Sequence, residues 1–247
     1  MSAGEITVTA MTHRGAVRPA NEDALVLGST TVSVTTSTPV RVYLPLTAPL
    51  IIAVADGIGG QAAGEIASEH AASRLAEMAP QVTDATMLGQ LLVNIDEELS
   101  DHAEQTEEFH GMGTTVAGVV VSPAGGVWFN VGDSRVYRMD GTSLVQVTED
   151  DSPPLPPSQD GRPATTNFIT QSLGGGSGKA VTPHIGPESG SAWLMCSDGL
   201  SDLVTVGEME KILKVHGDDE AAVYALWQAA MAAGGKDNIS VILARVG

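Results

Sequence analysis

The sequence has a single cysteine, few aromatic residues and few basic residues. Cys196 has no partner in the chain for a disulfide, which favours a reducing compartment, and its apolar neighbours predict a buried strand. Twelve Lys or Arg residues stand against 30 Asp or Glu, so the formal charge is −18 and the pI is near 4.4. Nucleic acids and anionic membranes bind basic patches, so we expect neither as a partner.

Long apolar runs are also missing. No window of about 18 apolar residues exists, and the N-terminus MSAGEITVTA lacks the basic start and apolar centre of a signal peptide. We therefore expect a cytoplasmic protein. The hydrophobic fraction of 43% is enough for a sizeable core, and no linker divides the chain. Residues 1–247 are expected to form a single domain that folds alone, as a monomer.

Hydrophobic periodicity predicts strands and helices in alternating blocks. Runs rich in Val, Thr and Ile predict strands at 4–11, 24–36 and 40–55, a meander of short strands over 114–147, and strands at 168–172, 180–185, 192–196 and 239–246. Amphipathic stretches predict helices at 60–78, 85–104, 206–215 and 219–233. Because strict β-α-β alternation is absent, an α+β fold with antiparallel sheets covered by helices is favoured.

Residues 149–166 contain five prolines among polar residues. This composition predicts an exposed loop with little regular structure. A loop of this length usually has a functional or regulatory role.

Two apolar, strand-like runs end in Asp-Gly. The first leads into Asp56 and Gly57, the second into Asp198 and Gly199, and a third aspartate, Asp237, precedes the last strand. These carboxylates could converge at one edge of the sheets, where oxygen ligands would select Mg²⁺ or Mn²⁺. Each Asp-Gly alone is more typical of a plain turn than of a metal site.

An arginine precedes an acidic cluster near the start of the chain. Arg18 lies three residues before Asn21, Glu22 and Asp23. A guanidinium can hold phosphate through paired hydrogen bonds while the acids hold a metal ion. As an isolated stretch, the segment also fits a solvated charged loop.

Six motifs together resemble the metal-dependent protein phosphatases of the type 2C class, particularly the bacterial serine/threonine members. They occur in the family's order and span most of the chain. The motifs are Gly15–Asp23, Val54–Gly60, Gly111–Thr115, Asn130–Tyr137, Cys196–Asp202 and Gly235–Ser240.

The resemblance implies a sandwich of two antiparallel sheets flanked by helix pairs, and it implies roles for individual residues. Asp56 would bridge two ions of Mn²⁺ or Mg²⁺, with the Gly57 carbonyl as a further ligand. Arg18 would grip the phosphate. The remaining residues implied in metal binding are Asp198 and Asp237 for the first ion, Glu22 and Asp23 at or behind the second, Asp133 with Asp198 for a third, and Asn238 behind the ligands.

The implied reaction is hydrolysis of phosphoserine and phosphothreonine in proteins, reversing the action of a serine/threonine kinase. Two cations would lower the pKa of a water between them, so that hydroxide attacks phosphorus without a nucleophilic side chain. The partners implied are phosphorylated proteins, first of all a kinase or its substrates.

The chain departs from the family pattern at three positions. Ile58 stands where some members have a histidine that could act as a general acid, so a water on a cation is the simplest proton donor. His13 stands where relatives usually have aspartate. Asp151 stands where the family commonly has histidine before a substantial flap. The flap around 149–166 is therefore expected to be short or remodelled.

Two rival functions share features with this sequence. Haloacid-dehalogenase phosphatases need a second aspartate two residues after the first, and here that position is Ile58. A catalytically silent binding or regulatory module of the same fold would typically have lost metal ligands, whereas Asp56, Asp198 and Asp237 are all present. Gly111–Thr115 could cradle phosphate, although close packing at the start of a strand is the favoured interpretation.

Overall fold

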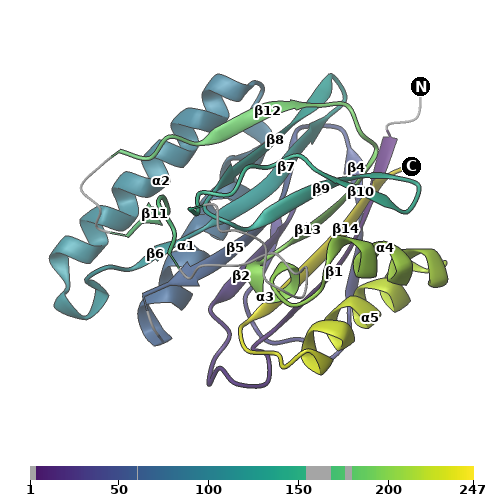
Figure 1. Ribbon diagram of the computed structural model, residues 1–247. Helices are drawn as coiled ribbons and strands as arrows, with labels where there is room; N and C mark the ends of the chain where they lie inside the picture. The colour runs from purple at the N-terminus through teal and green to yellow at the C-terminus, as the bar shows by residue number, and fades with distance from the viewer. Residues whose placement is uncertain (1–3, 60, 154–167, 176–179) are drawn as a thin grey trace.

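The protein builds one six-stranded antiparallel sheet around its last strand. A computed structural model describes residues 4–59, 61–153, 168–175 and 180–247. The order is β10-β9-β13-β14-β1-β4. The strands are β1 (Gly4–His13), β4 (Val40–Leu46), β9 (Arg135–Asp140), β10 (Ser143–Gln146), β13 (Ala192–Cys196) and β14 (Ile239–Val246). Because β1 pairs with β14, the first and last strands of the described chain are neighbours inside this sheet, and Figure 1 shows the two termini at the same end of it.

A second antiparallel sheet is centred on β5. Its path is β11-β6-β5-β7-β8-β12, and the hairpin of β2 and β3 joins it at β5. The strands are β2 (Asp23–Leu27), β3 (Thr30–Val32), β5 (Leu50–Ile58), β6 (Gly113–Thr114), β7 (Val116–Ser122), β8 (Gly125–Val131), β11 (Leu173–Gly174) and β12 (His184–Glu188).

Helices cover the outer face of each sheet, so the molecule has four layers (Figure 1). Three apolar clusters fill the spaces between the layers: one between the two sheets, one beneath α1 and α2, and one beneath α4 and α5. The helices are α1 (Gln61–Met78), α2 (Ala85–Gln105), α3 (Asp198–Ser201), α4 (Val206–Val215) and α5 (Asp219–Ala232), with the 3-10 turns η1 (Ala79–Gln81) and η2 (Glu107–Phe109).

The helix starts follow from local chemistry. Asp84 caps α2 by accepting the Met87 N–H, Asp218 caps α5 by accepting the Ala221 N–H, and Thr205 forms a capping box with Glu208 at the start of α4. These side chains satisfy backbone donors that the first helical turn leaves unpaired. Among the described residues, no helix has the length and apolar character needed to cross a membrane.

The predicted α+β sandwich of two antiparallel sheets is confirmed, and so is the burial of Cys196 within a strand. Several predicted boundaries were wrong. The run 24–36 is a hairpin that turns at Gly28, and the run 40–55 divides into β4 and β5, which belong to different sheets.

Two later strands were also misplaced. The predicted strand at 168–172 is irregular, with only the two-residue β11 beyond it, and the strand predicted at 180–185 instead runs from His184 to Glu188. Of the predicted loop, residues 149–153 have neither helix nor strand, and 154–166 lie outside the described residues.

Candidate active site

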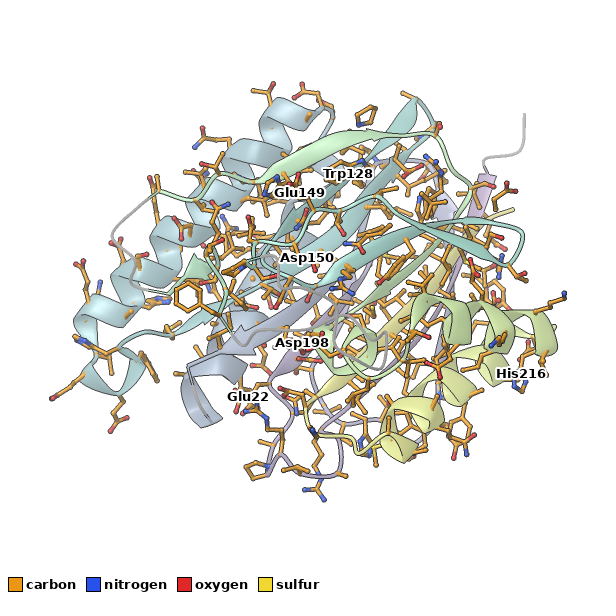
Figure 2. All side chains as sticks on the ribbon, in the orientation of Figure 1. Glu22, Trp128, Glu149, Asp150, Asp198 and His216 are labelled. Atoms are coloured by element: carbon orange, nitrogen blue, oxygen red, sulfur yellow. The ribbon has the colours of Figure 1, made fainter. Side chains whose placement is uncertain are left out.

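One cavity of about 180 Å³ opens at the end of the sheets where β5 leads toward α1 and β13 leads into α3. Its walls combine acidic residues, one arginine, backbone at two glycines and two isoleucines. In Figure 2, Glu22 and Asp198 lie in the lower middle of the molecule, and both line this cavity. The lining residues are Arg18, Glu22, Asp56, Gly57, Ile58, Gly59, Asp133, Ile169, Asp198, Asp237 and Asn238.

Asp56 ends the apolar part of β5, and Asp23 opens β2 directly opposite it. Asp23 is fully buried and accepts hydrogen bonds from Ser240 Oγ at 2.6 Å and Ser197 Oγ at 2.9 Å. Burial raises the pKa of Asp23 to about 7 despite these bonds. For Asp56, burial and the nearby carboxylate of Asp23 raise the pKa well above its ordinary value.

Asp198 approaches from the six-stranded sheet, and Asp133 from a turn that links the two sheets. Asp198 follows β13 and begins α3, and Asp133 lies in the turn between β8 and β9. Burial raises the pKa of Asp198 well above its usual range, and the charge of Asp133 adds to this effect. Burial likewise raises the pKa of Asp133 to about 6, with a contribution from Asp202. Several carboxylates therefore repel one another within a poorly solvated space, and a cation would relieve that repulsion.

The segment carrying Arg18 is held against the start of β14 by Asn238. The Asn238 side chain accepts the Glu22 N–H at 2.8 Å and donates to the carbonyls of Arg14 at 3.0 Å and Ala20 at 2.9 Å. Arg18 donates to Asp237 Oδ2 at 2.7 Å, and this bond raises the pKa of Arg18. The guanidinium thus lies at the cavity mouth while it remains about half exposed.

Close backbone packing brings Glu22 next to Asp56. Gly57 donates its N–H to the Glu22 carbonyl at 3.1 Å, and Ser68 Oγ on α1 donates to the same carbonyl at 2.6 Å. Gly64 on α1 leaves room for the Glu22 side chain, because a Cβ at position 64 would lie 2.5 Å from Glu22 Oε2. A larger residue at position 64 would displace the carboxylate.

The donor set fits a divalent cation. Three buried carboxylate oxygens, Oδ1 of Asp23, Asp133 and Asp198, have no hydrogen-bond partner within the described part of the chain. Burial of an oxygen without a hydrogen-bond partner destabilises the folded state unless an ion or a proton compensates it. Oxygen donors without nitrogen or sulfur favour hard cations.

The carboxylates line the cavity but do not form a complete coordination shell. Across the ranges that the structure describes, no three Asp, Glu, His or Cys side chains are already arranged as a metal shell. An open arrangement suits a hard divalent cation that retains several waters among its ligands.

Comparison with known proteins identifies the family. The family described as Protein phosphatase 2C matches residues 46–240, which is most of the chain. The chain belongs to the protein phosphatase 2C family.

Curated relatives of this phosphatase family come from several bacteria. A serine/threonine phosphatase stp of Listeria monocytogenes is 32% identical over 209 residues, covering 78% of this chain and 83% of the relative. The serine/threonine protein phosphatase PstP of Mycobacterium tuberculosis is 28% identical over 248 residues, covering 96% of this chain and 44% of the relative.

Solved structures of bacterial 2C phosphatases share the whole fold. The Mycobacterium tuberculosis phosphatase PstP/Ppp has a TM-score of 0.78 at 25% identity, with 98% of both chains covered. Stp1 from Staphylococcus aureus has a TM-score of 0.77 at 27% identity, covering 97% of this chain and 94% of that one. A structure of the PstP catalytic domain in complex with 2 manganese ions has a TM-score of 0.74 at 25% identity and covers 98% of this chain.

The structure brings most of the predicted site residues of this 2C phosphatase into one cavity. All of them line it except Asp23, which lies behind Asp56 and is bonded to two serines. Asn238 both lines the cavity and holds the loop that carries Arg18.

Sequence reasoning missed several contributors. Ser197 and Ser240 fall within the motifs quoted above, but nothing in a serine signals a bond to Asp23. Ile169 lines the cavity from a segment without a motif. Gly111–Thr115 lies outside the cavity lining, and Thr115 donates its N–H to the Asp56 carbonyl at 2.9 Å, which agrees with the packing interpretation.

Proposed function

We propose that the protein hydrolyses phosphoserine and phosphothreonine in proteins by means of Mn²⁺ or Mg²⁺ held in the carboxylate cavity. The observation that carries this proposal is the shared cavity itself, in which acidic residues with raised pKa values face an arginine at the mouth. The names of the bacterial relatives support the substrate class. The whole chain would act as one catalytic domain.

The proposed ligands come from five separated stretches of chain. Asp56 would be a ligand of two ions, and the Gly57 carbonyl would be a ligand of one of them. Asp198 and Asp237 would complete the first site, and Glu22 would serve the second. Asp23, buried behind Asp56, would orient the ligands, and Asp133 with Asp198 would hold a third ion. Bound cations would supply an activated water and neutralise charge on the phosphoryl oxygens.

Arg18 would bind and orient the phosphate. Its guanidinium donates to Asp237 and remains about half exposed, so phosphate oxygens can reach its other N–H groups in the folded protein. Paired hydrogen bonds would fix the phosphate relative to Asp56. The cavity lining has no Ser, Thr, Cys or His among the described residues. An aspartate nucleophile of the haloacid-dehalogenase type would need a second aspartate at position 58, which is Ile58, so a water rather than a side chain would attack phosphorus.

Ile58 and Ile169 supply the apolar part of the cavity wall. Apolar surface beside the carboxylates limits the access of bulk water and strengthens electrostatic interactions within the cavity. We propose phosphorylated proteins as partners, first of all a serine/threonine kinase or the proteins it modifies, and a monomeric enzyme.

Hydrolysis of matched peptides tests the substrate class. Purified protein with Mn²⁺ should release phosphate from phosphothreonine and phosphoserine peptides much faster than from the corresponding phosphotyrosine peptide. Asp198→Ala should abolish turnover, and its circular dichroism spectrum should show that the fold is retained. A folded, cation-loaded protein without turnover on any peptide would instead favour the silent binding module.

A further inference from the structure

Asp151 joins three segments of the chain beside the catalytic cavity. Its carboxylate is 7% exposed, and both oxygens are used. Oδ2 accepts the Gly132 N–H at 2.9 Å. Oδ1 accepts a hydrogen bond from Gln171 Nε2 at 2.9 Å. It also lies 2.9 Å from Nε2 of His184, which is the first residue of β12.

The backbone of Asp151 makes the same connections. Its N–H donates to the Gly132 carbonyl at 2.9 Å, and its carbonyl accepts the Thr170 N–H at 2.7 Å and Thr170 Oγ1 at 3.0 Å. Gln171 in turn accepts the Thr182 N–H at 2.8 Å. Residues on both sides of the proline-rich segment therefore meet at this one aspartate.

Gly132 is a constrained position that leads directly to Asp133. Its φ is 102°, and a Cβ there would lie 2.6 Å from the Thr115 side chain, so the backbone packs tightly against Thr115, the residue before β7. On that side, Thr115 Oγ1 is 2.8 Å from Ser134 Oγ, and Thr115 N–H donates to the Asp56 carbonyl. The Asp133 turn is thus held between Thr115 and Asp151.

The carboxylate of Asp133 depends on this backbone for its position. Its Oδ1 is buried and has no hydrogen-bond partner within the described residues. Ile169, next to Thr170, lines the same cavity as Asp133. Displacement of Asp151 would therefore move one carboxylate and one apolar wall of the cavity together.

We propose that Asp151, held by His184 and Gln171, is a positioning residue that fixes Asp133 and Ile169 in the catalytic cavity. It would act through the Gly132 backbone and Thr170, without touching substrate or cation. The inference rests on the proposed function, because it assigns Asp133 to cation binding. It also gives a role to a position at which this chain departs from the family pattern.

Calorimetric titration with Mn²⁺ tests the proposal without relying on turnover. Asp151→Ala should weaken the weakest Mn²⁺-binding step by about 10-fold, the lower end of what loss of an outer partner of a metal ligand costs. The KM for a phosphothreonine peptide should also rise, since Ile169 would shift. Asp151→Asn, which keeps an acceptor for the Gly132 N–H, should recover part of the affinity.

Asp96→Ala is the matched control. Asp96 is also 7% exposed, and it accepts a backbone N–H, that of Gly174, at 2.8 Å. Its removal should lower the melting temperature by a similar amount and leave Mn²⁺ affinity unchanged. If Asp151→Ala does not fold, His184→Ala should also lower the affinity for Mn²⁺, by a smaller factor.

Unchanged Mn²⁺ affinity in every folded Asp151 and His184 variant would overturn the positioning role while leaving the proposed function intact. An equal loss of affinity in Asp96→Ala would also overturn it, because general loosening would then explain the effect. Failure of the unaltered protein to bind Mn²⁺ at all would sink the proposed function and this inference together.

Discussion

Asp23 and Asp56 are direct partners across the antiparallel ladder of β2 and β5. The pairing places two carboxylates side by side with little water, because Asp23 is fully buried beneath two serine hydroxyls. Without a cation, such neighbours cannot both ionise at low cost. Ionisation of both carboxylates is therefore unfavourable, and a nearby divalent cation would make it favourable.

Stability of the cation-free protein should fall as pH rises. Burial raises the pKa of Asp23 to about 7 and that of Asp133 to about 6, against an ordinary value of 3.8. Between about pH 4 and 7 the folded state therefore binds more protons than the unfolded state, so stability decreases with pH. With chelator, the melting temperature should be higher at pH 5 than at pH 8. A drop of about 2–4 °C corresponds to roughly 1 kcal/mol at this size.

Saturating Mn²⁺ should reverse that trend, because cations and protons compete for the same oxygens. Scanning fluorimetry across this pH range with chelator and with Mn²⁺ provides the comparison. A chelated protein that is more stable at pH 8 than at pH 5 would contradict the proposed crowding of carboxylates.

Asp198→Asn should separate stability from function. Removal of one buried negative charge should raise the melting temperature in chelator, while turnover is lost and the stabilisation by Mn²⁺ shrinks. Asp96→Ala should instead lower the melting temperature, because the Gly174 N–H loses its buried acceptor, at a cost of about 1–3 kcal/mol. A lower melting temperature of Asp198→Asn in chelator would argue for a purely structural aspartate.

Arg18→Ala should raise the KM for a phosphothreonine peptide by about 10- to 100-fold, which corresponds to the loss of about 1.5–3 kcal/mol from a charged hydrogen bond. Its stability should change little, because the Arg18 and Asp237 side chains are 46% and 34% exposed. Steady-state kinetics at saturating Mn²⁺ measures the effect. Arg74→Ala, which breaks an ion pair between α1 and α2, is the control and should leave KM unchanged.

Gly64→Ala should weaken Mn²⁺ binding although it changes no charge. Ala in a helix normally stabilises relative to Gly by about 1 kcal/mol, but here the new Cβ would lie 2.5 Å from Glu22 Oε2. Gly207→Ala on α4, where a Cβ meets nothing within 4 Å, is the matched control and should be neutral or stabilising. Equal Mn²⁺ affinity in both variants would remove Glu22 from the proposed ligands.

Local sequence patterns were sufficient where an element depends on its own residues. The apolar runs before Asp56 and Asp198 are strands in which nearly every side chain is buried. A strand buried on both faces is a continuous apolar run in the sequence, so it can be recognised without tertiary information. The helices at 85–105 and 206–215 likewise carry their own caps and apolar faces. Convergence of the aspartates was expected partly from these strand ends and partly from the family resemblance.

Tertiary contacts decided what the sequence could not show. The run 40–55 is continuous in β propensity, yet β4 and β5 pair with different sheets after a turn at Thr47, whose N–H donates to the Pro45 carbonyl. The contact between Asp151 and His184 joins positions 33 residues apart. No spacing rule predicts such a pair, because both residues are placed by the strands around them.

Phosphate release from a phosphothreonine peptide, before and after removal of divalent cations, tests the central claim most directly. Turnover should vanish when cations are chelated and return when Mn²⁺ or Mg²⁺ is restored in excess. Turnover that persists in the fully chelated protein would contradict a cation-dependent phosphatase and would require a nucleophile from the chain itself.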